Sequence, residues 1–111
     1  MSAMAKKQKE KGDNFVAEAE AKMTKSKGFS LFGSSKEKKF EEAAELLEQA
    51  ANAYKVGGFN QEAGESYRKA AEIHRDQLTN LNEASKDMAQ AGNYYFLFSY
   101  SKGLFSYSSD N

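Results

Sequence analysis

The side chains that could support chemistry in this 111-residue chain are one histidine and scattered carboxylates. His74 has no cysteine, no second histidine and no helical H-E-x-x-H motif to accompany it, so neither a histidine-rich metal site nor a Ser-His-Asp triad is indicated. Glu41, Glu45 and Glu48 could serve acid–base chemistry or hold a divalent ion, but their spacing is typical of an exposed helix face. We therefore expect no catalytic residue, no cofactor, no metal site and no enzymatic activity.

The segment from Gly28 to Ser35 imitates a phosphate-binding loop. Its glycines match part of the pattern G-x-x-x-x-G-K-[ST], but Ser34 occupies the lysine position and a helix, not a strand, is expected before it. Nucleotide binding is therefore rejected. The segment carries three large apolar side chains between its glycines, with lysines on both sides: Phe29, Leu31 and Phe32.

Two interpretations of this apolar segment stay open. Its side chains either pack back against the first helices or enter the surface of a lipid bilayer. In the second case, lysines 25, 27 and 36 attract anionic headgroups, and each is worth about 1 kcal/mol near such a surface. Attachment of this kind is weak and reversible.

Three copies of one pattern organise the region that must position these residues. Each copy has Glu-Ala, an apolar residue four positions after the alanine, small residues seven and eight after it, and an aromatic residue or histidine eleven after it. The copies begin at Glu42, Glu62 and Glu83. This spacing forms one stripe on a helix of period about 3.6, and His74 occupies an aromatic position, so we expect it to pack. A single stripe cannot be buried alone, so we predict an all-α solenoid of stacked helices.

Caps and glycines set the expected helix boundaries. Ser34 with Glu37 and Asn80 with Glu83 resemble capping boxes, and Gly57-Gly58 ends a helix. The expected helices are approximately 34–57, 59 or 60 to 77, and 80–95. Glycines 64 and 92 lie inside two of them, which indicates close contact between helices.

A zero net charge hides an asymmetry. Residues 1–39 carry ten lysines and five acids, whereas residues 40–111 carry six basic residues and eleven acids. A basic front end favours an anionic surface such as phosphate, nucleic acid, anionic lipid or an acidic protein. The sequence shows no signal peptide and no apolar run long enough for a membrane span, and the absence of cysteine agrees with a cytosolic protein.

The two ends differ from the repeat region. Residues 1–12 are charged and we expect them to be flexible, with a weaker helix capped by Asp13 or Asn14 and running to about Lys27. The tail, residues 96–111, contains the word LFSYS twice. Its alternation of apolar residues and serine favours a strand or a hairpin about Lys102-Gly103, or a disordered segment prone to self-association.

Several segments resemble the N-terminal part of soluble NSF attachment proteins, most closely the alpha type. The similar segments are Ser30–Lys36, Ala50–Lys55, Ala63-Gly64 through Tyr67 to His74, and Ala91–Asn93, within a resemblance that covers 13–95. It implies an array of tetratricopeptide-like antiparallel helical hairpins. It also implies a cytoplasmic, peripheral membrane adaptor that binds SNARE bundles (syntaxin-like) through a basic face and recruits the NSF ATPase, with no role for nucleic acid.

The resemblance also assigns residues. It implies that Phe29, Leu31 and Phe32, in the membrane loop 28–35, contact the membrane. Anionic-surface or SNARE contacts are expected from lysines 22, 25, 27, 36 and 55. Gly57-Gly58 stands where the family usually has a basic residue, so the resemblance implies that one SNARE contact is weakened. Because residues 96–111 match no family segment and the chain is under half the length of a family member, without the C-terminal helical bundle, we expect a truncated form that lacks NSF stimulation. The alternative is a generic helical-repeat interaction module without a membrane role.

Overall fold

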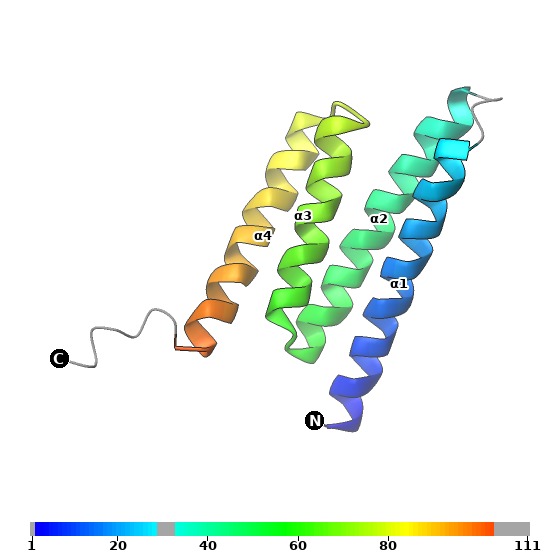
Figure 1. Ribbon diagram of the computed structural model, residues 1–111. Coiled ribbons are helices and arrows are strands. Elements are labelled where there is room, and N and C mark those ends of the chain that lie inside the picture. Colours follow the sequence, from blue (N-terminus) through cyan, green and yellow to red (C-terminus); the bar gives the residue numbers. More distant parts are fainter. Residues whose placement is uncertain (1, 29–32, 104–111) are drawn as a thin grey trace.

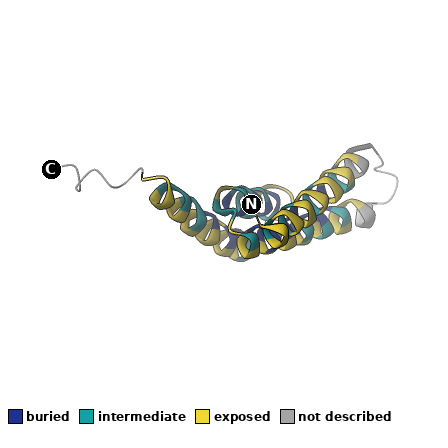
Figure 2. Ribbon diagram, turned by 90° about the horizontal axis from the view of Figure 1, so that it is seen from below, coloured by how far each residue is buried: buried dark blue, intermediate teal, exposed yellow. Residues whose placement is uncertain are grey.

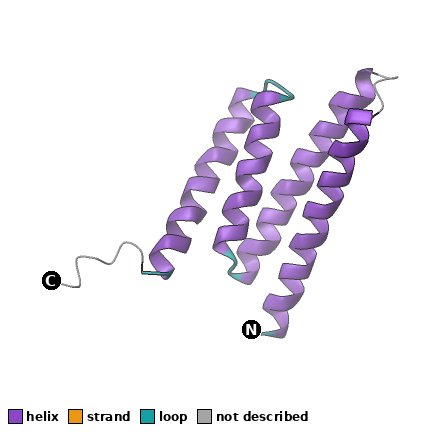
Figure 3. Ribbon diagram, viewed as in Figure 1, coloured by secondary structure: helices purple, strands orange, loops and turns teal. Residues whose placement is uncertain are grey.

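The computed structural model describes residues 2–28 and 33–103, with side chains omitted for 25–28 and 33–35. The described residues form four helices and no strand: α1 (Ala3–Gly28), α2 (Gly33–Gly57), α3 (Asn60–Asp76) and α4 (Leu81–Ser101). Each helix packs mainly against its neighbours in the chain, and the helices lie side by side in antiparallel order (Figure 1). Short turns join α2 to α3 and α3 to α4 (Figure 3). The predicted all-α array of helical hairpins is confirmed.

The repeat stripe builds the core. Ala43, Leu47 and Ala50 of α2 are fully buried, and so are Ala63 and Ala70 of α3. Buried residues lie on the faces that the helices turn toward one another, and exposed residues line the outside (Figure 2). The third copy departs from the pattern because its apolar position, Met88, is 43% exposed. The stripe on α4 is therefore buried at Ala84 and Ala91, half-buried at Tyr95, and exposed at Met88 and Gly92.

The predicted boundaries of α2 and α3 and the predicted start of α4 are confirmed to within about one residue. Gly58 has φ of 86°, a left-handed conformation that glycine adopts without strain, and α2 ends just before it. Asn80 caps α4, since its side-chain Oδ1 accepts a hydrogen bond from the Glu83 backbone N–H at 3.2 Å. Helix α3 begins at Asn60. The side chain of Ser34 is among those that are not described.

The expectation of a flexible N-terminus is wrong, because α1 begins at Ala3 and continues through Asp13 without a cap there. The reason is a close approach between helices. A Cβ at Gly12 would lie 2.6 Å from the ring of Tyr54, so the missing side chain lets that ring lie against α1. The Tyr54 hydroxyl donates a hydrogen bond to the Asp13 carboxylate. Nearer the start of α1, Gln8 approaches Gly57 in the same way.

The expectation of a strand or hairpin in the tail is wrong over its first part. Helix α4 runs to Ser101, past the predicted end at Tyr95, and Lys102 forms its C-cap. Phe96 is 56% exposed, and its ring lies 6.2 Å from that of Tyr100 one turn later. Residues 104–111 lie outside the described residues.

Gly64 and Gly92, the two glycines predicted to mark close contacts between helices, have different surroundings. A Cβ at Gly64 would lie 3.0 Å from the Tyr95 ring, which confirms the predicted close contact between α3 and α4. A Cβ at Gly92 would meet nothing within 4 Å, so the same prediction is wrong there.

Candidate functional site

The basic residues predicted to meet an anionic surface gather mainly at one end of the α1–α2 hairpin, which we call the hairpin tip. The tip comprises the last turns of α1 and the first turns of α2 (Figure 1). From Lys22 to Lys39 the sequence has six lysines and one glutamate, Glu37. The lysines are 22, 25 and 27 on α1 and 36, 38 and 39 on α2. Antiparallel pairing thus unites charges that are separated in the sequence.

Lys22 lies between the two helices of the tip. Its Nζ is 3.2 Å from Oε1 of Glu42 on α2, with both side chains partly exposed. Lys22 lowers the pKa of Glu42, and the nearby Lys38 and Lys39 act in the same direction. Glu42 therefore remains ionised at neutral pH, and Lys22 serves partly as a link between α1 and α2.

The structure gives the other predicted site residues different positions. Lys36 is exposed at the tip. Lys55 is exposed at the opposite end of α2, and at about 1.5 Å per residue it lies about 28 Å from Lys36. The side chains of Lys25 and Lys27 are not described, and Phe29, Leu31 and Phe32 lie outside the described residues. The structure therefore separates Lys55 from the tip.

Sequence reasoning left Lys38 and Lys39 out of the site. They lie two and three residues after Lys36 in the run K-E-K-K, and that run is the sequence signal that could have identified them. Lys38 is exposed and Lys39 is half-buried. Both belong to the tip.

A second group of charged side chains joins three helices. His74 of α3 has Nε2 3.5 Å from Oε2 of Glu48 on α2 and 3.7 Å from Oδ2 of Asp87 on α4. Glu83, one turn before Asp87, offers a further carboxylate. We call these four residues the His74 cluster. His74 was predicted to pack and is indeed 12% exposed, but no sequence signal places these carboxylates beside it, since they come from separate helices.

The carboxylates of the His74 cluster perturb one another. Burial raises the pKa of Asp87 to about 8, and the neighbouring Glu48 and Glu83 act in the same direction. Asp87 is 7% exposed, whereas Glu48 remains about one-third exposed. Asp87 therefore keeps its proton to a higher pH than an ordinary aspartate, because ionising three neighbouring carboxylates together is electrostatically costly.

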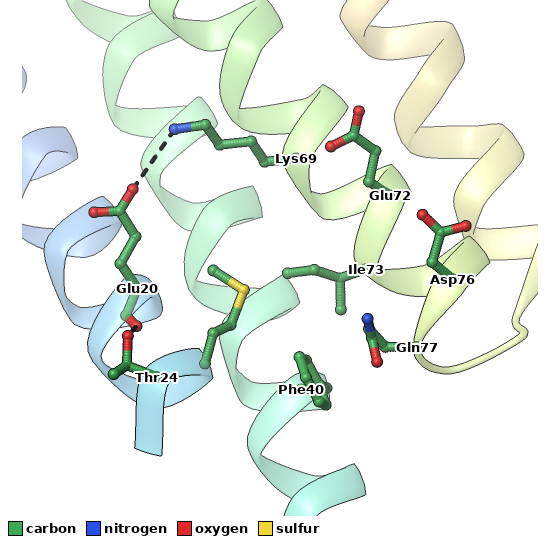
Figure 4. A pocket seen from close by; sticks show the side chains of 9 residues that line it. Glu20, Thr24, Phe40, Lys69, Glu72, Ile73, Asp76 and Gln77 are labelled. Atoms are coloured by element: carbon green, nitrogen blue, oxygen red, sulfur yellow. Dashed lines mark hydrogen bonds and ion pairs between the residues drawn. The ribbon is translucent and has the colours of Figure 1, made fainter. Parts of the chain in front are cut away.

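A groove of about 600 Å³ runs between α1 and α3 over Phe40 of α2 (Figure 4). Met23 and Ile73 add to its apolar floor, and charged residues form the rim. The acids on the rim are paired with basic residues: Glu20 with Lys69, Glu72 with Arg68 and Asp76 with Arg75. All three pairs are partly exposed ion pairs on the rim of the groove.

Within the part of the chain that the structure describes, no helix is both long enough and apolar enough to cross a bilayer.

The family model described as "Soluble NSF attachment protein, SNAP" matches residues 10–108, a range that includes most of the tail. A probable vesicular-fusion protein sec17 homolog of Neurospora crassa is 40% identical over 86 residues, which cover 75% of this chain and 29% of that protein. Human alpha-soluble NSF attachment protein is 38% identical over 82 residues, which cover 72% of this chain and 27% of that protein. The vesicular-fusion protein SEC17 of Komagataella phaffii is 34% identical over 86 residues, which cover 77% of this chain and 29% of that protein.

The chain thus spans less than a third of the length of these relatives. No solved structure matches it at a significant level. The helical array, the repeat pattern and the match over residues 10–108 agree with one another. The chain belongs to the soluble NSF attachment protein family.

Proposed function

We propose that this protein is an adaptor of the membrane-fusion machinery that binds SNARE bundles at a membrane surface. It acts as a peripheral, cytoplasmic protein on the pathway in which the NSF ATPase disassembles those bundles. The names of the relatives support this proposal, since two are called vesicular-fusion proteins and one an NSF attachment protein. The observation that carries it within this chain is the charge of the hairpin tip.

The hairpin tip is suited to an anionic membrane. Its six lysines flank the apolar segment that holds Phe29, Leu31 and Phe32, so attraction to headgroups and insertion of apolar side chains act at the same place. At about 1 kcal/mol for each lysine near the surface, the three lysines of α2 alone contribute about 3 kcal/mol. Lys22 contributes less, because Glu42 pairs with it.

Lys55 is suited to a different contact. A membrane that meets the tip lies about 28 Å from Lys55 along α2. We therefore assign Lys55 to the SNARE bundle, which projects from the membrane. The lysines of the tip, with Phe29, Leu31 and Phe32, are assigned to the lipid surface.

Co-sedimentation with vesicles tests the lipid contact. Replacing lysines 36, 38 and 39 with glutamine should weaken binding to vesicles rich in phosphatidylserine by about 100-fold at low salt, which corresponds to about 3 kcal/mol. The matched control replaces lysines 6, 7 and 11, which lie near the opposite end of the hairpin, with glutamine.

The control variant should bind nearly as well as the unaltered chain, because it loses the same charge away from the tip. Equal weakening by both variants would show that only net charge matters. That result, or binding to neither anionic nor neutral vesicles, would favour the alternative of a helical-repeat interaction module without a membrane role.

A further inference from the structure

The His74 cluster has the composition and spacing of a cation site. Single ligand atoms of Glu48, His74 and Glu83 all lie within 4.8 Å of one another, and they come from α2, α3 and α4. The cluster opens into a groove between α2 and α4 that is lined by further carboxylates, including Glu41 and Glu45. A cation therefore has both a set of ligands and an acidic route to reach them.

A second observation points to a ligand independently of this acidic character. Asp87 is 7% exposed, and its Oδ2 is buried without a hydrogen-bond partner. That oxygen faces the cluster, 3.7 Å from Nε2 of His74. A buried carboxylate oxygen without a partner costs free energy. Coordination of a cation would satisfy it.

We propose that Glu48, His74, Glu83 and Asp87 bind one divalent transition-metal ion of the zinc type. In a tetrahedral site with bonds of about 2.0–2.1 Å, neighbouring ligand atoms lie about 3.4 Å apart. The two separations measured from Nε2 of His74, 3.5 and 3.7 Å, are close to this value. Glu83 is 40% exposed, and its present partner is the exposed Nζ of Lys86 at 3.4 Å, so its side chain can leave that surface ion pair to complete the set.

The ligand types select the metal. An imidazole nitrogen with carboxylate oxygens suits Zn²⁺ and its first-row neighbours, whereas Mg²⁺ and Ca²⁺ prefer ligands that are all oxygen. Two positive charges would also offset the mutual repulsion of the three carboxylates. Because the ligands come from three successive helices, the ion would hold α4 to the preceding hairpin and stabilise the folded chain.

Zinc titration of the full 111-residue chain in buffer free of chelators tests the proposal. Calorimetry should give one Zn²⁺ per chain, and the thermal midpoint should rise with Zn²⁺ and fall back on addition of EDTA. Because His74 is the single histidine in the sequence, its ring resonances report the site without ambiguity and should shift on titration. Mg²⁺ at the same concentration should produce neither effect.

Substitutions distinguish coordination of Zn²⁺ by specific ligands from nonspecific attraction of Zn²⁺ to the acidic groove. Glu83→Gln should weaken zinc binding at least about tenfold, and Asp87→Asn should do the same while preserving the shape of a buried side chain. The matched control is Glu45→Gln, which removes one carboxylate from the same groove outside the cluster and should bind zinc as the unaltered chain does. Unchanged His74 resonances, or equal weakening by Glu83→Gln and Glu45→Gln, would overturn the proposal.

Discussion

Replacing Gly12 with alanine should destabilise the protein, although alanine is the better helix former. The added Cβ would lie 2.6–2.8 Å from three atoms of the Tyr54 ring, where carbon atoms normally lie about 3.5–4.0 Å apart. Tyr54 is 4% exposed and its hydroxyl is bonded to Asp13, so the ring has little room to move. Overpacking of this kind costs up to about 3 kcal/mol, and the gain in helix propensity returns about 1 kcal/mol. We expect a net loss of about 2 kcal/mol.

Urea unfolding at neutral pH, followed by circular dichroism, measures this loss. The matched control is Gly92→Ala, where the added Cβ meets nothing within 4 Å, so the same substitution should stabilise by about 0.5–1 kcal/mol. In a Tyr54→Ala background, Gly12→Ala should no longer destabilise, because the obstructing ring is absent. Shifts of the unfolding midpoint in the same direction for Gly12→Ala and Gly92→Ala would contradict overpacking at Gly12.

Two further predictions concern a carboxylate and a helix cap. The Tyr54 hydroxyl holds the pKa of Asp13 below its ordinary value of 3.8, so the Asp13 contribution is fully present above about pH 4 and is lost as the pH falls through the lowered pKa. Asp13→Asn should therefore reduce stability more at pH 7 than at pH 2.5 in urea titrations, and an equal loss at both values would contradict this. Asn80→Ala should lower the free energy of unfolding by about 1 kcal/mol, because it removes the N-terminal cap of α4. Asn82→Ala is the control. If it lowers the thermal midpoint as much as Asn80→Ala does, the cap is not the cause.

The sequence predicts those features of the fold that depend on neighbouring residues. The stripe of alanines and leucine defines α2 and α3, and both Gly58 and Asn80 mark helix ends through their own conformation or side chain. The N-terminal turns of α1 are different. Their one large apolar residue, Met4, is exposed, and they pack because Gly12 leaves room for a tyrosine 42 positions later in the chain. No local pattern carries that information.

The same distinction applies to the sites. The hairpin tip could be predicted in part, because two runs of lysine flank one short segment and any antiparallel hairpin brings such runs together. The His74 cluster could not, because the relative rotation of α2, α3 and α4 decides whether Glu48 and Asp87 face His74 or solvent. The spacing of residues along one helix does not specify how that helix is rotated about its axis relative to its neighbours.

The most direct test of the proposed adaptor role is co-sedimentation with vesicles that carry a SNARE bundle, compared with the same vesicles without it. The unaltered chain should bind more strongly when the bundle is present. The double variant Phe29→Ser, Phe32→Ser should lose most of this binding, because its apolar contact with the lipid is removed. Binding that is indifferent both to the bundle and to the double variant would contradict the proposal that this chain acts as a SNARE adaptor at membranes.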